Sequence, residues 1–161
     1  MSAVDVSYTI SGEGPPLYMV HGIGSRRVTW DGLLPGLEEH FTCVRYDLRG
    51  HGESPVPPVP YSLDDLVEDL EVLRLRLGHD RIHIIGHSLG GQIGPAYARA
   101  HPENTTSVVL LAGEFLRECK PYIEEGMHPQ TIVSLSTPVQ LPDSIAESLT
   151  FVTHVRYVPS W

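Results

Sequence analysis

The chain has 161 residues, 41% of them hydrophobic, which suits one domain with a buried core. Its formal charge of −9, from 20 acidic and 11 basic residues, argues against a nucleic-acid surface, because phosphate binding requires clustered Lys and Arg. The N-terminus lacks a signal-peptide pattern and no stretch of about 18 apolar residues occurs, so we expect a cytoplasmic protein that does not bind membranes.

Strand-like and helical patterns alternate through the first two thirds of the chain. Short apolar or alternating runs indicate strands, and apolar residues three and four apart indicate helices. In chain order we expect a strand at 4–10, a turn at 12–16, a strand at 17–20, a helix around 30–37, a strand at 41–46, a helix at 63–77, a strand at 81–85, a helix at 89–100 and a strand at 107–112.

The helix predicted at 63–77 has the best-marked ends. Ser62 can cap its N-terminus, and Gly78 is the expected C-terminal stop. Acidic side chains crowd its first half, where they suit the helix dipole, and we interpret them as one solvated face rather than a docking patch. These residues are Asp64, Asp65, Glu68, Asp69 and Glu71.

This alternation predicts an α/β fold, with a mostly parallel sheet flanked by helices and functional groups at the carboxyl ends of its strands. The pattern stops near Gly113, so we expect a core at 1–113 and an irregular tail at 114–161. In the tail we expect a helix at 144–149 and a strand at 149–158. The tail would be either the start of a cap region or a substitute edge strand.

Ser88 lies where a predicted strand meets a predicted helix, within the pattern Gly86-His-Ser-Leu-Gly90. A sharp turn there forces the serine into a strained backbone conformation and brings strand and helix close together, so its neighbours two positions away must be glycine. The turn raises Oγ above the sheet. It also leaves the amide of Leu89 at a helix N-terminus, where unpaired N–H groups stabilise negative charge.

A second donor for an oxyanion is expected from the segment His21-Gly-Ile-Gly24, which follows the predicted strand at 17–20. We expect the backbone amide of Ile23 to supply it. Each such donor contributes roughly 3 to 4 kcal/mol to transition-state stabilisation.

Together with Tyr-Asp-Leu-Arg-Gly-His-Gly-Glu-Ser at 46–54, these motifs resemble the α/β-hydrolase fold family over residues 4–113. The resemblance implies a serine hydrolase. The set of motifs is similar to that of small esterases and enol-lactone hydrolases of the family. It implies that Asp47, Arg49 and His51 shape the loop beside the site, and that His87 is a packing residue rather than the base. Serine at position 88 speaks against family members that use an aspartate there, such as haloalkane dehalogenases and epoxide hydrolases.

The family triad also needs an acid and a histidine on later strands, in domains of about 200 to 250 residues. The chain therefore resembles a C-terminally truncated member, lacking the last strands. Glu114 is a candidate acid, and His154 and His128 are candidate bases.

Two hypotheses follow. The first is a hydrolase that cleaves a small carboxylic ester or lactone through an acyl-enzyme on Ser88, with a small-molecule substrate and no cofactor or metal. The second is a non-catalytic fragment or binding module that lacks the general base. In the second case the sheet edge where later strands would pair is exposed and favours a homo-oligomer, unless the strand at 149–158 covers it.

Overall fold

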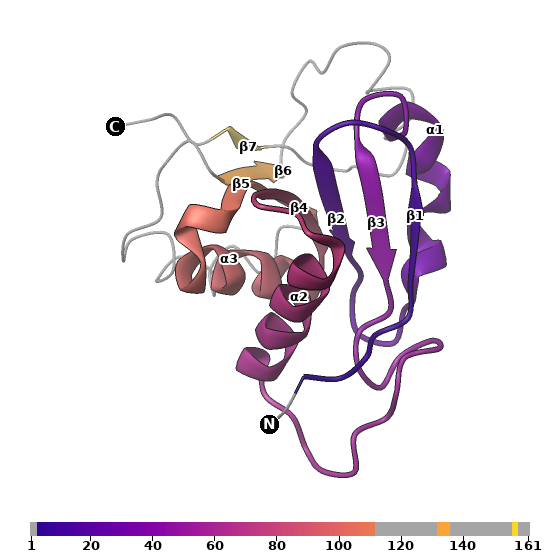
Figure 1. Ribbon diagram of the computed structural model, residues 1–161, viewed down its shortest axis with the longest axis vertical. Coiled ribbons are helices and arrows are strands. Elements are labelled where there is room, and N and C mark those ends of the chain that lie inside the picture. The colour runs from indigo at the N-terminus through magenta and orange to yellow at the C-terminus, as the bar shows by residue number, and fades with distance from the viewer. Residues whose placement is uncertain (1–2, 112–131, 136–155, 158–161) are drawn as a thin grey trace.

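A mixed, mostly parallel β-sheet runs through the centre of the molecule (Figure 1). The computed structural model describes residues 3–111, 132–135 and 156–157. Within this part the strand order is β1-β3-β2-β4-β5-β6-β7. The strands are β1 (Tyr8–Ser11), β2 (Pro16–Val20), β3 (Thr42–Tyr46), β4 (Ile82–His87), β5 (Thr105–Leu111), β6 (Ile132–Leu135) and β7 (Arg156–Tyr157).

The five strands from β3 to β6 in this order are parallel, whereas β1 and β7 pair antiparallel at the two ends. Val20 of β2 lies beside Tyr46 of β3 and Gly86 of β4. The loops that follow β2, β3 and β4 therefore leave the sheet at the same edge, which confirms the predicted mostly parallel α/β architecture.

Helices cover both faces of the sheet (Figure 1). α2 (Leu63–Leu77) and α3 (Gly90–Ala100) pack on one face, and the 3-10 helix η1 (Arg27–Leu33) and α1 (Leu34–Leu37) lie on the other. A short 3-10 turn, η2 (Pro102–Asn104), joins α3 to β5. The helical region predicted around 30–37 is thus mainly 3-10 helix. Gly32 and Pro35 explain this, because neither residue favours a regular α-helix.

Each face of the sheet has its own hydrophobic core. The larger core joins the sheet to α2 and α3 and includes the fully buried side chains of Tyr18, Leu70 and Tyr97. The smaller core joins the sheet to η1 and α1 through Trp30 and Met19. The alternation of side chains along β2 explains the two cores, since successive residues of a strand point to opposite faces.

The ends of α2 are those that the sequence predicts. The side chain of Ser62 accepts a hydrogen bond from the Asp65 amide at 3.3 Å, and the carboxylate of Asp65 accepts one from the Ser62 amide at 2.8 Å, which completes a capping box. Gly78 ends the helix in the left-handed conformation with φ 69°.

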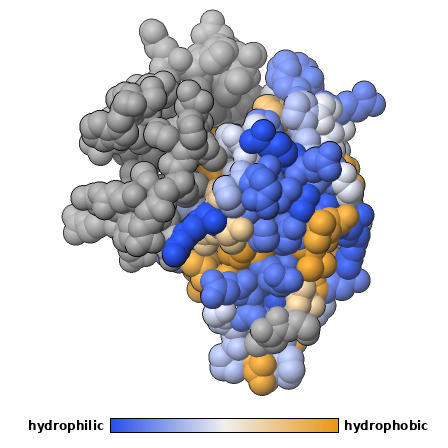
Figure 2. Space-filling model, turned by 60° about the vertical axis from the view of Figure 1, so that its left-hand side comes forward, coloured by the Kyte–Doolittle hydropathy of each residue, from blue (hydrophilic) through white to orange (hydrophobic). Residues whose placement is uncertain are grey.

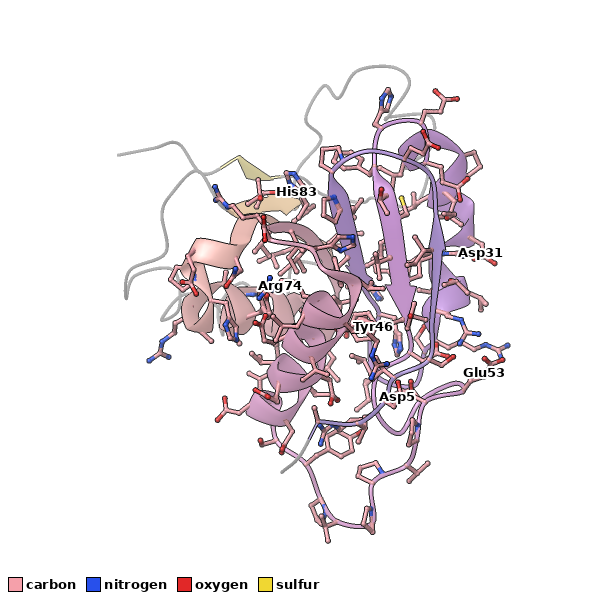
Figure 3. The ribbon with its side chains drawn as sticks, viewed as in Figure 1. Asp5, Asp31, Tyr46, Glu53, Arg74 and His83 are labelled. Carbon is pink, nitrogen blue, oxygen red and sulfur yellow. The ribbon has the colours of Figure 1, made fainter. Side chains whose placement is uncertain are left out.

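The interpretation of the acidic residues of α2 as one solvated face is wrong for three of them. Asp65 and Asp69 are only 8% and 1% exposed, because both face the buried guanidinium of Arg49. Glu71 binds Arg74 at 2.6 Å and accepts a hydrogen bond from the Tyr97 hydroxyl at 2.7 Å. Figure 3 shows Arg74 where α2 and α3 meet. Arg49, distant in sequence, and Arg74, one helical turn away, therefore hold acids that the helical pattern alone assigns to the surface.

The chain ends also differ from the sequence prediction. The first strand begins at Tyr8 rather than at residue 4, and the amide of Val4 instead donates to the Asp69 carboxylate at 2.8 Å. β6, which pairs with β5, was not predicted, and β7 lies inside the strand expected at 149–158. The helix expected at 144–149 and the boundary at Gly113 lie outside the described residues.

Exposed hydrophobic side chains are scattered over several elements. Figure 2 shows one face, on which hydrophobic areas lie between hydrophilic ones. No helix in the described segments is both long and apolar enough to cross a membrane. The exposed large hydrophobic residues are Ile10, Ile23, Val28, Val56, Val59, Tyr61 and Leu75.

Candidate active site

Ser88 occupies a strained turn between β4 and α3. Its φ is 54°, and among the described residues no other non-glycine residue has a positive φ. Such a conformation is unfavourable for a residue with a side chain and persists only where the surroundings enforce it. Here the Ser88 amide donates to the carbonyl of Leu111 in β5 at 3.3 Å, and its carbonyl accepts from the Gly91 amide at 2.8 Å. The sharp turn that the sequence predicts is therefore present.

Two glycines make this turn possible. A Cβ on Gly86 would lie 2.1 Å from the carbonyl oxygen of Gly90, and one on Gly90 would lie 2.1 Å from that of Val20. Both obstacles are backbone atoms that cannot rotate away. The strand, the helix and β2 thus approach so closely that only glycine fits, as the sequence pattern indicates.

The loop after β2 lies directly against this turn. A Cβ on Gly22 would stand 2.9 Å from the Cβ of Ser88, so the backbone of the loop touches the serine. Ile23 follows and is 76% exposed, and Gly24 adopts φ 69°. The structure therefore brings Ser88, Ile23 and Leu89, the three residues that the sequence predicts for the site, to one edge of the sheet.

His21 is fully buried at the start of this loop and holds it on both sides of its ring. Its Nδ1 lies 2.8 Å from the carbonyl oxygen of Gly22, and its Nε2 accepts from the Leu48 amide at 3.0 Å. The amide can only donate, so Nδ1 carries the proton and donates to Gly22. Burial lowers the pKa of His21 below its usual value and so favours this neutral form, although the bond to Gly22 partly offsets the shift by raising the pKa.

His51 reaches the same loop from the segment after β3. Its Nε2 accepts from the Gly24 amide at 3.1 Å, and its Nδ1 donates to the carbonyl of Arg49 at 3.0 Å. The rings of His21 and His51 meet edge to face at 5.3 Å between centroids. Both nitrogens of each ring are engaged with backbone groups, so neither histidine has a free nitrogen for the Ser88 proton.

Asp47 fixes the far end of the loop. Its carboxylate accepts from the amide of Arg27 at 2.6 Å and from that of Glu53 at 3.0 Å, and it pairs with the Arg27 guanidinium. Burial raises the pKa of Asp47, but these amides and the Arg27 charge outweigh it and lower the pKa overall. Arg27 also binds Glu53 at 2.6 Å; Figure 3 shows Glu53 beyond the carboxyl end of β3.

Arg49 anchors the same segment to α2 through a buried ion pair. Its guanidinium binds the Asp69 carboxylate twice, with both N–O distances 2.6 Å, and donates to the Asp65 carbonyl at 3.0 Å. Hydrogen bonding to Asp69 raises the pKa of Arg49. The contacts of Asp47, Arg49 and His51 thus confirm the expected loop-shaping role. Sequence reasoning missed the contribution of Arg27, for which no local motif gives a signal.

The other predicted residues divide into two groups. His87 is exposed, so the expectation of a packed side chain is wrong, although its Nδ1 would lie 3.3 Å from a Cβ on Gly22. Glu114, His128 and His154, the candidate acid and bases, lie outside the described residues. In the described segments no group of three or more His, Cys, Asp or Glu side chains is arranged to hold a metal ion.

The strained serine turn, the glycine-rich loop beside it and the parallel sheet together define an α/β-hydrolase core. The model of the alpha/beta hydrolase fold family matches residues 15–140, and the chain belongs to that family.

Three similar proteins illustrate the relationship. The chain is 34% identical over 110 residues to a pimeloyl-[acyl-carrier protein] methyl ester esterase of Aeromonas hydrophila, covering 68% of this chain and 42% of the esterase. It is 33% identical over 113 residues to a fluoroacetate dehalogenase of a Burkholderia species, covering 67% and 37%. A hydrolase from Pseudomonas aeruginosa aligns with a TM-score of 0.64 at 35% identity, covering 75% and 49%.

The aligned parts span 31% to 42% of the length of such curated relatives. Complete members of the family thus carry much sequence beyond the portion that this chain matches.

Proposed function

We propose that the chain carries the nucleophile half of a serine hydrolase that cleaves a small carboxylic ester or lactone through an acyl-enzyme on Ser88. The observation that carries this proposal is the left-handed backbone of Ser88, with φ 54°, at the junction of β4 and α3. Strain of this kind is kept where it positions a functional group. A serine that served only as a turn residue would be replaceable by glycine at lower energy.

In the proposed reaction Ser88 Oγ attacks the carbonyl carbon and loses its proton to a general base. The C–O bond to the leaving alcohol then breaks, and the alcohol takes up a proton. Water hydrolyses the resulting acyl-serine, releasing the acid and restoring the hydroxyl. The amides of Ile23 and Leu89 would hold the negative oxygen in both steps, each contributing roughly 3 to 4 kcal/mol.

Two observations support an ester or lactone over other substrates. A serine attacks an acyl carbon and gives an acyl-enzyme that water can hydrolyse, whereas displacement of a halide or opening of an epoxide is suited to a carboxylate nucleophile. One relative at 34% identity is named as a methyl ester esterase. The dehalogenase relative at 33% identity shares the fold, but position 88 of this chain is serine.

The test is labelling of the purified chain with a fluorophosphonate probe, compared with Ser88→Ala. We expect the probe to label the chain at Ser88 and to leave the variant unlabelled, with peptide mass spectrometry identifying the modified residue. Equal labelling of both proteins, or none of either, would contradict the proposed nucleophile.

The second candidate is a non-catalytic fragment or binding module that lacks the general base. It is favoured by one observation, that the chain matches only 31% to 42% of the length of curated relatives. In that case Ser88 would remain unreactive although its turn is intact. Extending the coding sequence through the family's later strands would then restore labelling.

We further propose that the protein acts in the cytoplasm on a small molecule, without nucleic-acid or membrane partners. Self-association through a sheet edge is a related proposal. Size-exclusion chromatography with light scattering tests it, and a monomer at all concentrations would contradict it.

A further inference from the structure

The loop that carries Ile23 has little intrinsic reason to hold one conformation. Glycine flanks Ile23 on both sides, and glycine restricts the backbone least of all residues. Ile23 is 76% exposed, so its packing contributes little to the loop's order. An oxyanion donor must nevertheless be preorganised, because a donor that reorients during the reaction stabilises the transition state less. Something other than packing therefore has to fix this segment.

Two histidines bind the peptide groups on either side of Ile23. His21 Nδ1–H donates to the Gly22 carbonyl, which belongs to the same planar peptide as the Ile23 N–H. The Ser25 amide donates to the same oxygen at 3.2 Å. Since the N–H of a trans peptide points opposite to its carbonyl, these bonds set the direction of the Ile23 amide. The next peptide, which ends in the Gly24 N–H, is bound by His51 Nε2.

We propose that His51 is a positioning residue for the oxyanion hole and acts through Gly24, as the partner of His21. With one peptide plane fixed by His21 and the next fixed by His51, both backbone dihedrals of Ile23 are restrained. His51 itself is held by its bond to the Arg49 carbonyl, and Arg49 is locked by Asp69. This inference rests on the proposed function, because it assigns His51 a role only if Ser88 performs acyl transfer.

A matched set of variants tests the proposal with the complete chain. His51→Leu removes the acceptor for the Gly24 amide, whereas His51→Gln can supply a side-chain oxygen in its place. His40→Leu is the control, since His40 is exposed in the turn before β3, at the opposite edge of the sheet. The measurement is the second-order rate constant for fluorophosphonate labelling of Ser88, with thermal denaturation to verify that each variant is folded.

We expect His51→Leu to label about 10-fold more slowly, less than the loss of a whole oxyanion donor because the amide is misaligned rather than removed. His51→Gln should recover to within about 3-fold of the wild-type rate, and His40→Leu should match the wild type. Backbone amide exchange measured by NMR should become at least about 10-fold faster at Gly24 in His51→Leu alone, because a lost hydrogen bond exposes that amide.

Each contrary result has a distinct meaning. If the wild type labels at Ser88 and His51→Leu labels equally fast, the positioning role is refuted while the proposed nucleophile stands. If the Gly24 amide is protected in His51→Gln but this variant labels as slowly as His51→Leu, His51 has only a structural role and does not position the oxyanion donor. If the wild type does not label at all, the proposed function fails and the role of His51 fails with it.

Discussion

The packing at the serine turn makes Gly86 highly sensitive to a small substitution. In Gly86→Ala the new Cβ would meet the carbonyl oxygen of Gly90 at 2.1 Å, about 1.3 Å closer than the 3.4 Å at which ordinary contact begins. The next two obstacles are also backbone atoms, at 2.4 and 2.8 Å, so no rotamer change relieves the clash. Strand and helix must separate, and buried contacts are lost along their length.

Gly91→Ala, in the first turn of α3, is the matched control. A Cβ there would have its nearest neighbour at 3.8 Å, which is ordinary contact. Because alanine favours a helix over glycine by roughly 0.5 to 1 kcal/mol, Gly91→Ala should be neutral or slightly stabilising. Overpacking of a core site typically destabilises by about 1 to 3 kcal/mol, and a backbone clash of this size belongs at or above the upper limit. We expect the two variants to differ by about 4 kcal/mol.

Urea denaturation followed by far-UV circular dichroism measures this difference. With a slope of about 2 kcal/mol/M for a chain of this size, the two midpoints should lie about 2 M apart. Gly86→Ala should also slow fluorophosphonate labelling of Ser88, because the turn is displaced. Midpoints within about 0.5 M of one another would refute the argument that close backbone approach fixes this glycine.

Two further predictions concern buried ionisable groups. Asp69→Ala removes the carboxylate that binds the buried Arg49 guanidinium twice and leaves Asp65, at 3.7 Å, as its acidic partner, so it should destabilise by about 3 kcal/mol. Asp64→Ala on the exposed side of the same helix should change stability by less than about 0.5 kcal/mol; equal urea midpoints would contradict this. Burial lowers the pKa of three histidines below 6.5. Just below that pH the unfolded chain therefore binds more protons than the folded one, so the free energy of unfolding should rise as pH increases from about 5.5 to 7. Urea midpoints across this range test the slope, and His83→Gln should flatten it. The three residues are His21, His79 and His83.

Much of the fold can be predicted from the sequence, because local signals and tertiary structure agree there. The Ser62 cap and the Gly78 stop delimit α2 through bonds within one turn, which a sequence pattern can contain. The turn at Ser88 is likewise predictable, since its glycines are demanded by strand–helix contact at fixed spacing. The helix predicted around 30–37 is mainly 3-10 helix in the structure, because Gly32 and Pro35 oppose a regular α-helix there.

The remaining features depend on partners far apart in the sequence. Helical spacing cannot tell a solvated aspartate from one buried against Arg49, 20 residues earlier. Strand β6 pairs with β5, with Val108 beside Ile132, a contact between residues 24 apart that no local pattern encodes. The same limit applies to the candidate site. The motif identifies Ser88, but the bond from the Gly24 amide to His51 spans 27 residues, and no local pattern encodes it.

These long-range contacts form a series of hydrogen bonds that runs from α2 to the loop beside the serine turn. Asp69 fixes Arg49, the carbonyl of Arg49 holds His51, and His51 holds Gly24 beside Ile23. A buried ion pair adds little to the free energy of unfolding, because desolvation of the charges offsets much of their attraction. Hydrophobic side chains of similar volume often stabilise a protein equally well. A hydrophobic pair cannot, however, fix the orientation of the loop backbone. The burial of Asp69 is therefore better explained by the precision it gives to the loop after β3 than by any net contribution to folding.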